Sequence, residues 1–111
     1  MILSQYTSLE KECIYQVVCA AMIADGERDP RELRLVEEIV DVIGLTPQER
    51  EASRKLDEPS ITRVIRSMDD LKRIYVGKFM AQMVLADGVV TEREEMFIRY
   101  AFARLNIPEV D

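Results

Sequence analysis

Apolar residues recur at three- and four-residue spacing in several separate stretches of the chain, a pattern that predicts amphipathic helices. Thr7, with Glu10 three residues later, has the form of a capping box and is expected to start the first helix. The Ala24-Asp25-Gly26 step is expected to end it. The stripe between these signals contains Ile14, Val17, Val18, Ala21 and Met22.

A second helix is predicted to begin at Asp29, because Asp is a preferred N-cap and Pro30 suits the first helical position. Glu32 stands at the capping-box position. Gly44 is suited to the C-terminal cap. The apolar stripe of this helix contains Leu35, Val36, Ile39, Val40 and Ile43.

The middle and end of the chain repeat these signals. Thr46 is expected to open a third, more polar helix that runs to about Leu56, and residues 57–60 have the composition of a break. A short helix over Ile61 to Met68 follows, and Asp69 caps a long helix that ends at 87–88. A final helix is predicted from the Thr91 and Glu94 capping box, with a stripe of Phe97, Ile98, Ala101, Phe102 and Leu105. The predicted fold class is all-α, a bundle of six helices without strands.

The two Ala-Asp-Gly steps belong to an internal repeat. A shift of 62 positions places 24–26 on 86–88 and Arg31-Glu32 on Arg93-Glu94. The same shift superposes the apolar stripe at 35–45 on the stripe at 97–107. Repeat one is placed at about 9–47 and repeat two at about 71–109. Since neither hairpin can cover its own apolar face, the two are expected to pack face to face, with a pseudo-twofold axis as one arrangement.

Length and composition favour one soluble domain over residues 1–111. The chain is 48% hydrophobic and holds only four Gly and four Pro, which suits one core. Its longest apolar stretch without charges, residues 13–24, is too short for a membrane-spanning helix of ~20 residues. The first residues lack the basic flank of a signal peptide, so a cytoplasmic location is expected.

Charge is unevenly distributed. The net charge of −6 opposes binding to nucleic acid. Residues 1–49 hold four Lys/Arg against ten Asp/Glu, and residues 79–111 hold three against six, whereas residues 50–78 hold eight against five. Two acidic hairpins therefore flank a net-basic middle segment.

Little in the sequence favours catalysis. The chain has no histidine, so a Ser-His-Asp or Cys-His arrangement cannot form, and no glycine-rich phosphate loop is present. Cys13 and Cys19 are predicted on different faces of one helix, as ordinary core or boundary residues. The adjacent acids at 37–38 and 94–95 diverge on their helices and are expected to be solvated. A non-enzymatic protein is predicted.

Both Ala-Asp-Gly loops gather acidic residues, and two interpretations stay open. An EF-hand is rejected, because its first ligand positions would fall on Ala21 and Ile23 and on Met83 and Leu85. In the first interpretation the acids only cap helices and hold turns. In the second they form a smaller oxygen-only site for a hard cation, Ca²⁺ or Mg²⁺. The candidate metal ligands are Asp25, Asp29, Glu32, Asp87 and Glu94.

The pattern also resembles the tellurite-resistance protein TerB and its relatives. The resemblance rests on residues 22–27 with Glu32, on Ile43-Gly44-Leu45, and on residues 85–88 with Glu94. It implies an all-helical, repeat-derived bacterial cytoplasmic domain tied to tellurite or other chemical stress. It also implies a membrane-associated protein partner and divalent metal at the loop acids.

Two functions follow as hypotheses. The first is a protein-interaction module that binds a partner through its oppositely charged surfaces, with homodimerisation as one outcome. The second is a domain that binds or senses Ca²⁺ or Mg²⁺ through the Asp-Gly loops.

Overall fold

Six helices account for most of the described chain, and no strand occurs in it. A computed structural model describes residues 5–24, 30–86, 88 and 90–108. The helices are α1 (Ser8–Met22), α2 (Pro30–Ile43), α3 (Pro47–Ser53), α4 (Glu58–Arg66), α5 (Asp70–Leu85) and α6 (Glu92–Leu105). The all-α prediction is confirmed.

Side-chain caps start the helices, as local sequence signals predict. At Thr7 the capping box is complete, since Thr7 Oγ1 accepts from the Glu10 N–H at 3.1 Å and Glu10 Oε1 accepts from the Thr7 N–H at 2.9 Å. The predicted boxes at Thr46 and Thr91 are also complete. Asp69 caps α5 as predicted, whereas the predicted cap Asp29 lies outside the described residues.

Two predicted boundaries in the middle of the chain are wrong. Residues 57–60 are not a break: the Asp57 carboxylate accepts from the Ser60 N–H at 2.9 Å, and α4 begins at Glu58 with Pro59 in its first turn. Proline is tolerated there because the first N–H groups of a helix have no intrahelical partner. The preceding helix, α3, ends at Ser53 instead of continuing to Leu56.

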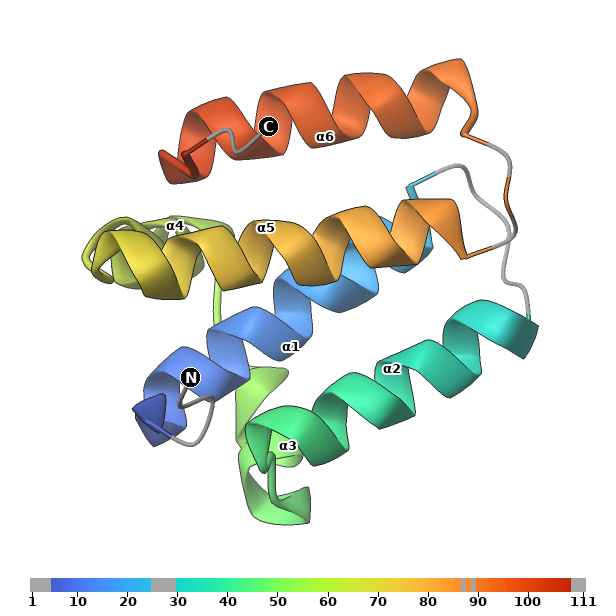
Figure 1. Ribbon diagram of the computed structural model, residues 1–111. Coiled ribbons are helices and arrows are strands. Elements are labelled where there is room, and N and C mark those ends of the chain that lie inside the picture. Colours follow the sequence, from blue (N-terminus) through green and yellow to red (C-terminus); the bar gives the residue numbers. More distant parts are fainter. Residues whose placement is uncertain (1–4, 25–29, 87, 89, 109–111) are drawn as a thin grey trace.

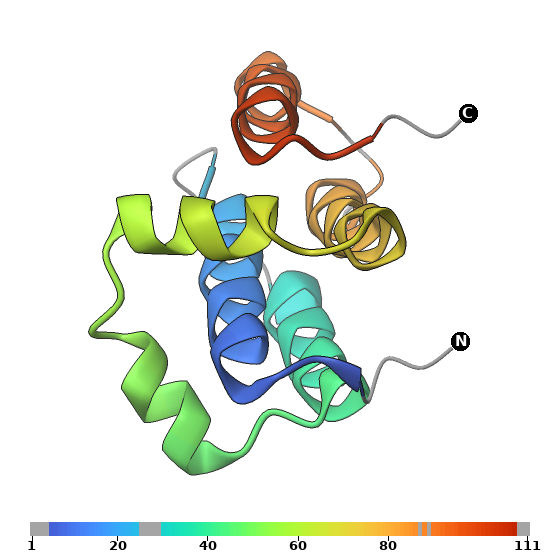
Figure 2. The same ribbon diagram turned by 90° about the vertical axis from the view of Figure 1, so that its left-hand side faces the viewer.

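The two hairpins α1–α2 and α5–α6 pack through their first helices. Helices α1 and α5 contact each other at the centre, and each outer helix contacts the inner helix of the other hairpin, α2 on α5 and α6 on α1. Figure 1 shows α6 above α5, with α1 and α2 below them. Helix α4 crosses α1 and contacts α6, while α3 packs on α1 (Figure 2).

The 62-residue repeat is visible in the helix boundaries. Adding 62 to the bounds of α2, 30–43, gives 92–105, the bounds of α6, and adding it to those of α1, 8–22, gives 70–84, one residue short of α5. Each hairpin ends in the left-handed region, at Gly44 with φ 73° and at Asn106 with φ 57°. The N–H of the next residue then bonds back in both, Leu45 to the Val40 carbonyl at 3.0 Å and Ile107 to the Phe102 carbonyl at 2.9 Å. Both C-termini therefore close by the same backbone motif.

A basic side chain ties the two helices of each hairpin together at the same repeat position. Lys11 Nζ donates to the Gly44 carbonyl oxygen at 3.1 Å, and Arg73 donates to the Asn106 carbonyl oxygen. The positions correspond, because 11 plus 62 is 73 and 44 plus 62 is 106. A cation at the C-terminal carbonyls of a helix also favours the helix dipole.

The inner helices supply the centre of the core. Repeat-related pairs are buried alike, with Ile14 and Val76 at 0% exposure and Val18 and Met80 at 1%. Cys13 is fully buried and Cys19 half-buried, and they form no disulfide, in agreement with the sequence. Burial, followed by the charges of Glu12 and Glu10, raises the pKa of the Cys13 thiol to about 11.

Candidate binding site

Of the five predicted metal ligands, two lie within the described residues. Asp25, Asp29 and Asp87 lie outside the described residues. Glu32 and Glu94 are buried, in the first turns of α2 and α6. Glu94 Oε1 accepts from the Thr91 N–H at 3.0 Å, so its carboxylate serves the capping box.

The burial of Glu94 corrects one expectation. The adjacent acids at 94–95 were expected to be solvated, yet only Glu95 is exposed, because the capping carboxylate folds back over the start of α6. Within the described ranges, no three acidic or cysteine side chains lie close enough to hold a metal ion. The Ca²⁺ or Mg²⁺ site stays a prediction, which a thermal-shift titration with each ion would check.

The basic middle segment is largely engaged within the fold. Arg50 donates two hydrogen bonds to Glu37, at 3.0 and 2.7 Å, and a third to the Tyr15 hydroxyl at 2.9 Å. The hydrogen bonds from Arg50 lower the pKa of Glu37. Lys72 pairs with Glu10 at 2.9 Å. The segment therefore offers fewer available cations to a partner than its composition suggests.

Two further arginines of this segment hold the C-terminal end of α6. Arg66 donates to the Arg104 carbonyl oxygen at 3.2 Å, and Arg73 donates to that of Asn106. Lys55, Arg63 and Lys78 are the exposed cations that remain outside such contacts, and Lys78 lies over the Tyr75 ring at 5.5 Å. Few cations of this segment are therefore available for a binding face that relies on charge alone.

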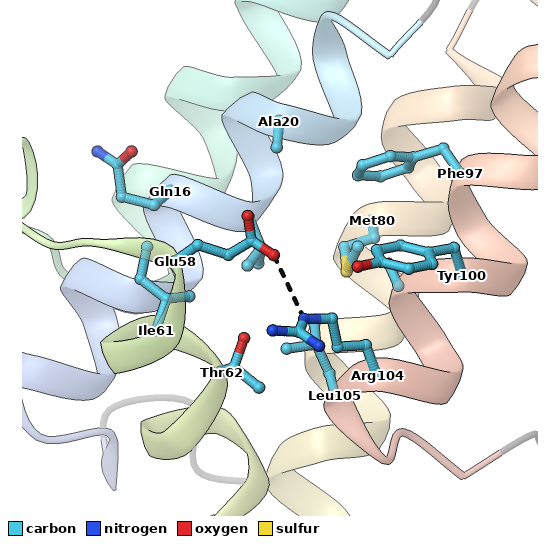
Figure 3. A pocket seen from close by; sticks show the side chains of 12 residues that line it. Gln16, Ala20, Glu58, Ile61, Thr62, Met80, Phe97, Tyr100, Arg104 and Leu105 are labelled. Atoms are coloured by element: carbon cyan, nitrogen blue, oxygen red, sulfur yellow. Dashed lines mark ion pairs between the residues drawn. The ribbon is translucent and has the colours of Figure 1, made fainter.

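A hollow between α1, α4 and α6 is a better-formed candidate. It has a volume of about 320 Å³. Apolar side chains line most of it, and polar groups stand at its mouth (Figure 3). The lining residues are Gln16, Val17 and Ala20 from α1, Glu58, Ile61 and Thr62 from α4, Met80 from α5, and Phe97, Tyr100, Ala101, Arg104 and Leu105 from α6.

Small residues at core-facing positions leave this space open. Ala20 and Ala101 line the hollow from α1 and α6. On the other side Gln16 is fixed, because its amide donates to Ser53 Oγ at 2.9 Å and Ser53 Oγ donates to the Arg50 carbonyl at 2.6 Å. The hollow thus has small side chains on one side and a hydrogen-bonded Gln16 on the other.

Charged and aromatic groups surround the mouth. Arg104 Nε and Glu58 Oε1 form an ion pair of 3.3 Å between α6 and α4, and their side chains are 44% and 71% exposed. Figure 3 shows this pair facing across the opening. Tyr100 is 61% exposed beside it, and Met96, one turn earlier on α6, is 63% exposed. An exposed pair of this length contributes little to stability, so a partner can displace it at small cost.

The sequence did not reveal this site. Its signal was faint: the stripe of α6 carries a small residue at Ala101 and an aromatic, Tyr100, just beside it. Whether these positions are covered depends on where α4 packs, and helical periodicity contains no information on that. The lining groups suit binding, since apolar pockets with a few polar groups at the rim hold ligands or partner side chains.

No protein-family model and no curated protein matches this sequence. The fold is similar to that of a protein of unknown function from Porphyromonas gingivalis, known from a crystal structure, with a TM-score of 0.82 and 17% identity. The match covers 95% of this chain and 83% of the other. At this identity the likeness establishes the fold, an all-α helical bundle.

Proposed function

We propose that this chain is a non-enzymatic protein-interaction domain that takes an apolar side chain of its partner into the hollow between α1, α4 and α6. The observation that carries the proposal is the hollow itself, about 320 Å³ of mostly apolar lining next to the exposed Tyr100 and Met96. Sites of this form commonly anchor one residue of a partner.

The residue types around the hollow support an interface. Aromatic residues, Met and Arg are enriched where proteins meet, and here they are Phe97, Tyr100, Met96, Met80 and Arg104. The ion pair of Glu58 and Arg104 supplies a polar rim, with each charge ready to contact a partner. In this proposal, recognition of the partner depends mainly on shape and apolar contact, and the surface charges of the acidic hairpins assist its approach.

The resemblance to TerB suggests the setting that we propose for this interaction: a bacterial stress response, in the cytoplasm, with a membrane-associated protein as one class of partner. In the described part of the chain, no helix is long and apolar enough to cross a membrane. The partner is proposed to be a protein and not a nucleic acid, in line with the net charge of −6.

Site-specific photo-crosslinking tests the proposal. A photoreactive phenylalanine replaces Met96, beside the mouth, or Lys55, which is exposed on the turn after α3. Each variant is irradiated in the cells that make the protein. We expect a discrete crosslinked species from position 96 and none from position 55.

A filled hollow provides the matched control. Ala20→Leu adds three carbons inside the hollow, and Ala103→Leu adds them to an exposed position of α6 outside it. The crosslink from position 96 should be lost in the first background and kept in the second. A crosslink that persists with Ala20→Leu would contradict the proposal.

A further inference from the structure

A second groove lies between α2 and α5. It has a volume of about 340 Å³ and an apolar floor. Val42 on its wall is 49% exposed, and the charged Glu38 and Lys78 stand at its edges. Its lining residues are Leu35, Glu38, Ile39 and Val42 from α2, with Tyr75, Lys78, Phe79 and Gln82 from α5.

Under the 62-residue repeat, this groove corresponds to the hollow between α1, α4 and α6. Seven of its eight lining residues fall, at a shift of 62, on residues that line the hollow between α1, α4 and α6. The exception is Tyr75, whose counterpart is Cys13. The matched pairs are Leu35 with Phe97, Glu38 with Tyr100, Ile39 with Ala101, Val42 with Arg104, Lys78 with Gln16, Phe79 with Val17, and Gln82 with Ala20.

The two sites differ in what lies over them. On the α1/α6 side the chain places its own helix, since α4 packs against both α1 and α6 and lines the hollow with Ile61 and Thr62. On the α2/α5 side the lining comes from α2 and α5 only, among the residues that the structure describes. The packing of α4 on α1 and α6 thus shows how a short helix can lie on one copy of this duplicated site.

We propose that the α2/α5 groove binds an amphipathic helix of a partner protein, seated across α2 and α5 as α4 is seated across α1 and α6. This deepens the interaction function proposed above but concerns a different surface. The crosslinking test at Met96 and the test below can therefore fail independently.

The lining of the groove defines the chemistry of the incoming helix. It needs aliphatic residues one turn apart, as Ile61, Val64 and Ile65 are on α4, because apolar anchors at three- and four-residue spacing form one helical face. An acidic residue at the place of Glu58 would lose its partner, because Arg104 is replaced by Val42 at the equivalent position. Charges at the edges should complement Glu38 and Lys78.

The sequence of α4 provides a probe peptide for this groove. A fluorescent peptide with the sequence of residues 57–68 carries Glu58→Leu, so that an apolar side chain faces Val42. A hydrocarbon staple joins position 63 on α4 and position 67, the residue that caps its C-terminus, and both positions are exposed. The staple is needed because an isolated helix of this length is barely stable in water.

Fluorescence polarisation measures binding of this peptide to the intact chain and to two variants. Val42→Asp puts a charge on the groove wall, whereas Leu33→Asp makes the same change at a position of α2 that is 45% exposed and outside the groove. We expect Val42→Asp to weaken binding by about tenfold or more, since burying an unpaired carboxylate is costly, and Leu33→Asp to leave it unchanged. Melting temperatures of the three proteins verify that each is folded.

Three results would overturn the proposal. One is the absence of saturable binding below about 1 mM peptide. Another is equal affinity for the unsubstituted protein and Val42→Asp. The third is concentration-dependent self-association, seen by analytical ultracentrifugation, that Val42→Asp abolishes and Leu33→Asp does not, because a second copy of the chain would then occupy the groove.

Discussion

The two hairpins share one backbone plan and differ in how their second helices are packed. In α2 the stripe positions Val36, Ile39 and Ile43 are at most 3% exposed. In α6 the equivalent Ile98 is only half-buried, and Ala101 and Leu105 border the hollow. A duplicated helix hairpin can therefore keep its caps and braces while the stripe of one outer helix is fully packed and that of the other borders a hollow.

Side-chain size explains much of this difference. The inner helix carries Tyr15 in the first hairpin and Gly77 at the equivalent position of the second. A Cβ at Gly77 would lie 2.8 Å from Ile107 Cγ2 and 3.0 Å from Phe102 Cζ, so α6 and the residues after it approach α5 closely there. The adjacent residue of α6, the small Ala101, borders the hollow that α1 also lines.

The largest effect is expected from Gly77→Leu, which would break the close approach between α5 and α6. A branched side chain has no room beside Ile107 and Phe102, so the free energy of unfolding should fall by about 3 kcal/mol or more. Urea denaturation measures it, with Gln82→Leu, an exposed position on the same helix, as the control. A loss below about 1 kcal/mol would mean that α6 can move away without cost.

Paired truncations compare the packing of the two outer helices. Ile43 and Leu105 are repeat-related and 2% and 5% exposed, but only Leu105 borders the hollow. Ile43→Ala should cost about 3 kcal/mol of unfolding free energy, and Leu105→Ala about 1 kcal/mol less, because fewer contacts surround a side chain beside an existing space. Equal costs in urea denaturation would contradict the difference between the hairpins.

The basic braces should behave alike in both hairpins. Lys11→Met and Arg73→Met keep the apolar stem but remove the donor to the carbonyls of Gly44 and Asn106, which directly follow α2 and α6. Each should lower the free energy of unfolding by about 2 kcal/mol, the usual range for a hydrogen bond from a charged group. If thermal or urea denaturation shows a loss in one hairpin and none in the other, the braces are not equivalent.

A smaller loss of stability is expected at acid pH where Glu49 of α3 pairs with Lys11 of the first hairpin. Burial pushes the pKa of Glu49 upward, but hydrogen bonds from Ser8, the Thr46 backbone and Lys11 outweigh it and lower the pKa from 4.5 to about 2. Because the folded pKa is depressed, this stabilisation is present above pH 4.5 and is lost as the pH falls toward 2.

The contribution of ionised Glu49 is measured by comparing the unfolding free energies of the unsubstituted protein and the Glu49→Gln variant across pH. Above pH 4.5 the unsubstituted protein should be more stable by about 1 kcal/mol, since solvent screening reduces the effect of the shift, and the difference should vanish near pH 2. Glu51→Gln, on the exposed face of the same helix, serves as the control. A difference that does not change with pH would contradict the assignment.

The sequence predicted what depends on local signals. The capping boxes at Thr7, Thr46 and Thr91 and the 62-residue repeat were predicted because each is decided within a few residues or by direct comparison of two segments. The start of α4 was missed because Asp57 and Pro59 are equally typical of a break and of a helix N-terminus.

The candidate site was not predicted, for a tertiary reason. The hollow is lined by the small residues Ala20 and Ala101 where α4 packs against both α1 and α6, and no local pattern defines that packing. The basic segment was interpreted as a charged surface for a partner, yet Arg50 and Lys72 form ion pairs with Glu37 and Glu10 of the same chain. Composition gave the charge of this segment but not the direction of its side chains.

The claim that α4 packs over one copy of a duplicated groove, and that the other copy accepts a helix of a partner, can be tested by localising a helix on the molecule. The stapled peptide of residues 57–68, carrying a nitroxide, is added to the isotope-labelled chain, and paramagnetic broadening of amide signals is recorded by NMR. We predict broadening over residues 35–42 of α2 and 75–82 of α5. Broadening confined to α1 and α6, with the peptide in the place of the chain's own α4, would contradict it.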